Sequence, residues 1–154
     1  MIRQIHKNLR RLMKYGVLLS TIGLLVSVLI QIYGRFFLAA SPPWTEEASR
    51  LFFIYTVAFA AAPALGEGYF IALDLLPKGM PDLWRQRLGR CVQLTIIGLC
   101  AVLAVYAWGF VRLGFAEQSP GMGFRMAIAF FSVFLLFASV AALELLRMAR
   151  PQSP

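Results

Sequence analysis

The stretch CVQLTIIGLCAVLAVYAWGFV, residues 91–111, runs for 21 residues without a charged side chain. As a helix it would be about 32 Å long, close to the roughly 30 Å thickness of the hydrocarbon core of a bilayer. Three further uncharged runs occupy residues 15–34, 51–66 and 126–143. The sequence therefore predicts four transmembrane helices, at about residues 15–38, 45–66, 88–112 and 125–146.

The composition also indicates a membrane protein. Apolar residues make up 60% of the 154 residues and charged residues 14%, against roughly 25% charged in an ordinary soluble domain. A soluble domain of this size exposes too much surface to hide that much hydrocarbon. We expect an all-α membrane protein with a single integral domain, residues 1–154. The run 51–66 is short, but Arg50 can snorkel toward the headgroups while the helix extends back to Glu47.

The first apolar run could instead be a secretory signal peptide, since a basic segment precedes it and FLAAS follows it. Its apolar core is longer than the roughly 7–15 residues of a signal peptide. Arg35, Phe37 and Leu38 also do not fit the small residues of a cleavage site. We expect the segment to be retained as the first span.

The net charge of +8 is distributed unevenly along the chain. Of the 15 Lys and Arg residues, 11 lie before the first span, between the second and third spans, or after the fourth. By the positive-inside rule, both termini and the connection between the second and third spans are cytoplasmic. The charge therefore indicates topology and not a nucleic-acid partner.

Residues 1–14 carry two stripes of opposite character, each at helical spacing. The apolar stripe is Ile2, Ile5, Leu9 and Leu12, and the basic stripe is Arg3, Lys7, Arg10 and Lys14. This pattern predicts an N-terminal amphipathic interfacial helix whose cations lie on anionic lipid. A frayed basic tail is the alternative.

Small and polar residues recur along one face of the first span, at Gly16, Ser20, Gly23, Ser27 and Gln31. A second small-residue patch in the second span contains Ala58 and Ala62. Small residues let helices approach closely in lipid, and a polar amide there needs an internal partner. We expect these faces to pack on protein, either within this chain or against another subunit.

The chain offers little for catalysis or cofactor binding. It has one histidine, no C-x-x-C and no H-E-x-x-H, so it has no recognisable haem, disulfide-exchange or zinc motif. We therefore expect no enzyme activity, no cofactor and no metal site. Glu144 is the only carboxylate near a span interior, and we expect it to pair with Arg147 three residues on.

The most polar cluster between two spans is SPPWTEEASRLFF, residues 41–53. Its prolines suit the start of a helix capped by Ser41, or a stiff approach to a helix capped by Thr45. Glu46 and Glu47 lie near the positive end of the helix dipole, and Arg50 can pair with either of them. Helix capping accounts for the acidic and basic residues, but it does not explain a tryptophan, Trp44, just before them.

This cluster, with EGYFIALDLLP about twenty residues after it, resembles the small, Q-type membrane subunit of tripartite ATP-independent periplasmic (TRAP) transporters. The family has W-x-E-E-x-x-R at the start of its second span and E-G-x-H-I-x-x-D after it. The matching residues are Trp44, Glu46, Glu47, Arg50, Glu67, Gly68, Ile71 and Asp74. Phe70 stands where many members have histidine, which argues against a shared polar function at that position.

The resemblance implies a subunit of the bacterial inner membrane that works within a larger assembly. Its partners would be a large multi-span membrane subunit with the sodium and substrate sites, a periplasmic substrate-binding protein, and membrane lipids. The small subunit would scaffold the large one during sodium-coupled uptake of organic acids or related solutes. Trp44, Glu46, Glu47, Arg50, Glu67 and Asp74 would then lie at a subunit or lipid interface.

Three alternatives stay open at this point. Trp44 and the charges near it could only cap and anchor the second span. The chain could be a self-contained four-helix pump or channel acting as a homo-oligomer, in which Gln31, Glu144 or Arg147 would face a wet pathway. It could also be an accessory subunit of some other membrane complex.

Overall fold

The structure is a computed structural model, and it describes residues 2–37, 42–66 and 82–148. Four helices make up its architecture: α1 (Ile2–Phe37), α2 (Pro43–Gly66), α3 (Asp82–Leu113) and α4 (Ala127–Met148). Each is long and apolar enough to cross a membrane. The predicted all-α class with four transmembrane helices is confirmed.

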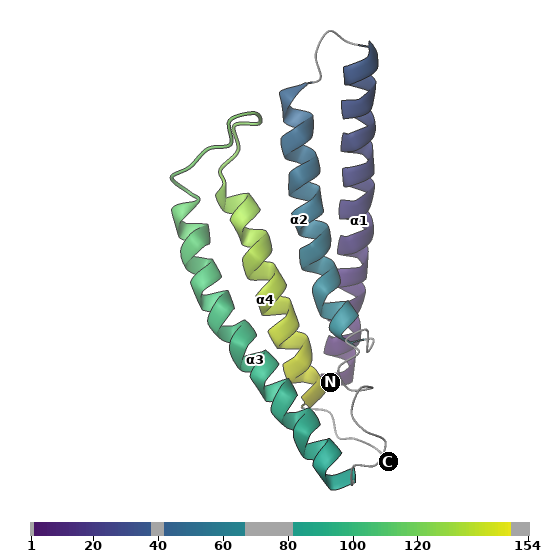
Figure 1. Ribbon diagram of the computed structural model, residues 1–154, viewed down its shortest axis with the longest axis vertical. Helices are drawn as coiled ribbons and strands as arrows, with labels where there is room; N and C mark the ends of the chain where they lie inside the picture. The colour runs from purple at the N-terminus through teal and green to yellow at the C-terminus, as the bar shows by residue number, and fades with distance from the viewer. Residues whose placement is uncertain (1, 38–41, 67–81, 149–154) are drawn as a thin grey trace.

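The helices lie side by side in the order α3, α4, α2, α1 (Figure 1). α1 packs along α2, α2 along α4, and α4 along α3, while α1 and α4 touch over a shorter length. We call the end where α1 begins and α4 ends the termini end. The opposite end, where α2 begins beside the connection between α3 and α4, we call the loop end.

The predicted spans agree in part with the observed helices. α2 and α4 begin and end within two residues of the predicted bounds, whereas α3 begins at Asp82, ahead of the predicted residue 88. α1 shows no break at residue 14. The predicted interfacial segment and the predicted first span form one 36-residue helix. Its length of about 54 Å exceeds the hydrocarbon thickness. The interfacial position of residues 1–14 stays a prediction.

Two glycines let α1 approach α2 closely. A Cβ atom added at Gly16 would lie 2.6 Å from the ring of Phe59, and one added at Gly23 would lie 2.6 Å from the ring of Phe52. Both distances are far below van der Waals contact, so a larger residue at either position would force the ring or the helices to shift. The sequence left open whether the small-residue stripe of α1 packs within this chain or against another subunit. At Gly16 and Gly23 it packs within the chain.

Hydroxyl groups complete the same seam. Thr56 of α2 donates to Ser20 Oγ at 3.0 Å, and Ser20 donates to the carbonyl of Gly16 at 2.7 Å. Ser27 is buried and donates to the Gly23 carbonyl, while Gln31 is half-buried. The serine hydroxyls of the stripe are thus hydrogen-bonded between or within the two helices, as a lipid environment requires.

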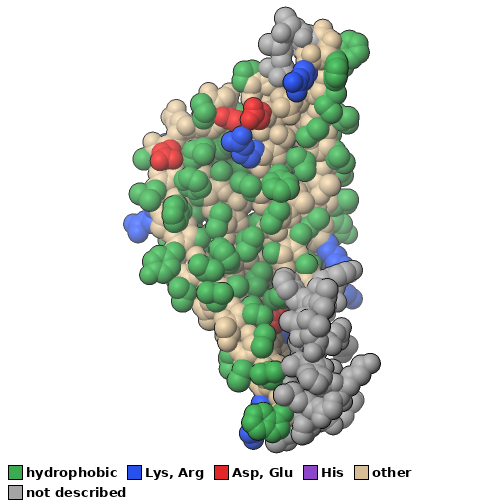
Figure 2. Space-filling model, in the orientation of Figure 1, with side chains coloured by type: hydrophobic (Ala, Val, Ile, Leu, Met, Phe, Trp, Pro, Cys, Tyr) green, Lys and Arg blue, Asp and Glu red, His purple; other side chains and the backbone are tan. Residues whose placement is uncertain are grey.

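The best-buried apolar cluster lies toward the termini end and joins three helices. It consists of Ala62 of α2, Cys100 of α3, and Val140 and Leu143 of α4. Ala58, one turn from Ala62, is also buried. Large apolar side chains on α1 and α3 remain exposed, and Figure 2 shows hydrophobic side chains across the middle of one face. Such surface is suited to lipid or to another membrane subunit.

Candidate functional site

The first turn of α2 is built on Thr45, which is fully buried. Both its hydroxyl and its backbone N–H donate to the carbonyl of Pro42, at 2.7 and 3.1 Å. The helix begins at Pro43, so Thr45 lies inside the first turn and is not its cap. Of the two starts that the sequence left open, the one with a Thr45 cap is excluded, because Pro43 already belongs to the helix. Ser41 lies outside the described residues.

Glu47 turns toward the connection between α3 and α4. Its carboxylate accepts a hydrogen bond from the Ser119 hydroxyl. It also accepts the backbone N–H groups of Gly121 at 2.8 Å and Met122 at 2.7 Å. An ionised carboxylate is an acceptor with several lone pairs, which suits three donors converging on it. Glu47 therefore fastens this loop to α2.

The loop itself, residues 114–126, is a compact hairpin. Ser119 donates its N–H to the Phe124 carbonyl at 2.8 Å and accepts the N–H of Gly123 at 3.0 Å. Gly123 has a φ of 69°, a left-handed conformation that favours glycine. Gly121 is needed for a different reason, because a Cβ there would lie 2.9 Å from Glu47 Cδ. The backbone N–H groups of the tip are thereby presented to the carboxylate.

The other residues of the α2 start point outward. Arg50 Nη2 lies 3.0 Å from Glu46 Oε1, and the two side chains are 73% and 66% exposed. Trp44 is 41% exposed. The residues at the start of α2 that were predicted at an interface therefore fall into two groups. Glu47 is engaged within the chain, whereas Trp44, Glu46 and Arg50 remain accessible at the loop end.

A second polar network lies at the termini end. Glu144 is buried, and its Oε1 lies 2.9 Å from Arg147 Nη1, so the predicted pairing of these two residues is confirmed. Gln93 of α3 donates to Glu144 Oε2 at 3.0 Å, and Arg147 also reaches the Leu65 carbonyl of α2 at 3.4 Å. The network thus links α2, α3 and α4.

Sequence reasoning did not find the partners that α3 and its loop provide. Neither Gln93 nor the 119–122 tip was assigned a role. Glu67 and Asp74, which were predicted at an interface, lie outside the described residues. Within residues 2–37, 42–66 and 82–148, no group of three or more His, Cys, Asp or Glu side chains is placed to hold a metal ion.

The family model for the DctQ component of tripartite ATP-independent periplasmic transporters matches residues 24–152. The chain belongs to this family. It is also similar to a Haemophilus influenzae protein named "Putative TRAP transporter small permease protein". The two are 22% identical over 142 residues, which cover 89% of this chain and 79% of that protein. The resemblance found in the W-x-E-E-x-x-R motif is thereby confirmed at the level of the family.

Proposed function

We propose that this chain is the small membrane subunit of a TRAP transporter and that it scaffolds the large membrane subunit. The observation that carries the proposal is the family match over residues 24–152. The fold is compatible with it, since the polar groups of the α1–α2 seam and of the Glu144 network are used to join helices. Broad apolar faces on α1 and α3 leave room for a partner in the membrane.

The loop end is the proposed contact site. Trp44, Glu46 and Arg50 are exposed there, and a Trp beside charged groups suits the headgroup layer or a neighbouring subunit. Glu47 would act indirectly, because it sets the position of the 114–126 loop beside them.

The remaining parts of the proposal follow from the family and the charge distribution. The chain would lie in the bacterial inner membrane with both termini cytoplasmic, which places the loop end on the periplasmic side. A periplasmic substrate-binding protein would deliver organic acids or related solutes for sodium-coupled uptake. The residues that select the solute would belong to the other subunits.

Charge reversal at the exposed ion pair tests the contact role. Arg50→Glu in the full transporter should weaken co-purification of the large subunit and lower uptake, because a cation at the contact becomes an anion. The double variant Glu46→Arg with Arg50→Glu restores the intrachain pair but not the contact. If the double variant recovers co-purification and uptake, or if Arg50→Glu alone keeps both, the contact role is wrong. Glu46 and Arg50 would then only cap and anchor α2.

Reconstitution of the purified chain tests the scaffold role against a self-contained pump or channel. Liposomes containing this chain alone should show no solute or ion flux. Liposomes that also contain the large subunit should show uptake when the binding protein and substrate are added. Flux through the small chain alone would overturn the scaffold role.

A further inference from the structure

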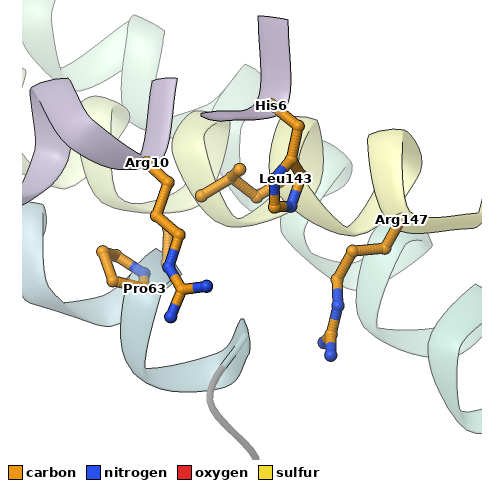
Figure 3. Close-up of a pocket in the computed structure, with 6 residues that line it drawn as sticks. His6, Arg10, Pro63, Leu143 and Arg147 are labelled. Carbon is orange, nitrogen blue, oxygen red and sulfur yellow. The ribbon is translucent and has the colours of Figure 1, made fainter. Parts of the chain in front are cut away.

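A pocket at the termini end lies between α1, α2 and α4. Its lining residues are His6, Arg10, Ala62, Pro63, Leu143 and Arg147 (Figure 3). The cavity of about 10 Å³ has room for about one water molecule. Its basic residues also interact with other groups of the protein. This pocket is therefore suited to a water and not to a larger ligand.

A chemically reactive side chain is exposed at the loop end. Met122, in the tip of the 114–126 hairpin, is 44% exposed. Among the other methionines of the described ranges, Met13 is 4% exposed, Met126 is half-buried, and Met148 at the termini end is 43% exposed. Oxidation of a thioether requires that the oxidant reach the sulfur. Met122 is thus the methionine of the loop end that an oxidant in water reaches most readily.

Met122 also takes part in the contact that ties the hairpin to α2. Its backbone N–H donates to the Glu47 carboxylate at 2.7 Å, beside the Gly121 N–H at 2.8 Å. More than half of the residue is covered by the protein. One residue therefore carries both an oxidisable sulfur and a donor of this contact. Met148 has a similar exposure but lies at the opposite end of the molecule.

We propose that Met122 is a site of oxidation to the sulfoxide and that this modification loosens the contact with Glu47. Hydrogen peroxide supplies the oxygen atom. Its O–O bond breaks, an S–O bond forms at Met122 Sδ, the sulfur loses two electrons, and water leaves. The proposed orientation places the loop end in the periplasm, which an oxidant from outside the cell reaches first.

Two properties of the sulfoxide would weaken the contact. The side chain becomes polar, so its covered part gains hydration by moving into water. The new oxygen is also an acceptor, and it lies on the residue next to a carboxylate that only accepts. It therefore brings no new donor to Glu47. This modification is independent of the transport role.

Peroxide treatment of the full chain, purified in detergent, tests the site. Peptide mass spectrometry should show that Met122 gains one oxygen several-fold faster than Met13, the buried reference on α1. If Met122 reacts no faster than Met13, it is not an accessible oxidation site and the proposal is wrong.

Hydrogen exchange at the Gly121 and Met122 amides tests the loosening. After oxidation, both amides should exchange several-fold faster in the wild type and in the control Met148→Leu. Met122→Leu, which has an apolar side chain of similar volume and no sulfur, should show no such increase. Methionine sulfoxide reductases with a dithiol should restore the original rate in the wild type. An equal increase in Met122→Leu, or none in the oxidised wild type, would overturn the proposal.

Discussion

Glu47 and Met122 are 75 residues apart, yet the Met122 backbone N–H donates to the Glu47 carboxylate at 2.7 Å. With the bonds from Ser119 and Gly121, this contact joins the N-terminal part of α2 to the connection between α3 and α4. The loop end of the protein is therefore one connected unit that includes the exposed Glu46–Arg50 pair.

Removal of the Glu47 carboxylate should release the loop without unfolding the helices. In Glu47→Ala, we expect the amides of Gly121 and Met122 to exchange hydrogen several-fold faster, because their acceptor is lost. Hydrogen exchange followed by mass spectrometry measures this. Glu46→Ala is the control, since Glu46 bonds only Arg50 among the described contacts at that carboxylate. Unchanged exchange in both variants would mean that the hairpin holds its shape by itself.

A Gly→Ala change in the seam between α1 and α2 should have the opposite effect on stability to the same change at an open position on α3. Gly16→Ala places a methyl group against the Phe59 ring and should destabilise the fold by about 1–3 kcal/mol. Gly98→Ala on α3 meets no atom within 4 Å and should be neutral or stabilising by up to about 1 kcal/mol through helix propensity. Unfolding in SDS mixtures measures both. Equal effects would contradict the tight seam.

The Gln93 amide should matter because Glu144 is buried. Gln93→Leu removes the bond to Glu144 Oε2 and should cost about 1–3 kcal/mol of unfolding free energy. Thr95→Val is a matched control on the same helix, since the Thr95 hydroxyl donates only to its own Cys91 carbonyl. If the control costs as much as Gln93→Leu, the network does not contribute to stability.

A single hydroxyl also connects α2 and α4 nearer the loop end. Tyr55 donates to the Ile128 carbonyl at 2.8 Å, so Tyr55→Phe should cost about 0.6 kcal/mol, a typical interhelical value in lipid. Tyr106→Phe removes a hydroxyl from an exposed ring on α3 and should change the stability less. A larger loss from the Tyr106 variant would show that the Tyr55 bond is not formed in the bilayer.

Local sequence patterns predicted much of the fold. Long uncharged runs imply spanning helices because no water is available to satisfy an open backbone, and the Gly16–Ser20–Gly23 spacing identified the packing face of α1. Glu144 and Arg147 could be paired because they lie one turn apart on one helix. In each case the signal extends over a few residues.

Contacts between distant segments could not be predicted in the same way. The bonds to Glu47 depend on which N–H groups the 119–122 tip turns inward, and this is set by the hairpin and not by residue type. Arg10 and Arg11 are adjacent and chemically identical, but one turns into a pocket completed by α4 and the other to the surface. The positions of α2 and α4 relative to α1 distinguish them.

The arrangement of the helices as a row, with α1 and α3 at its opposite edges, has a geometric consequence for permeation. Four rods in a line make a wall, and a wall does not close around a lumen. A hydrated solute crossing beside it would need the remaining sides of its passage to be supplied by other polypeptides. This geometry is compatible with the proposed role of a scaffold beside a larger subunit.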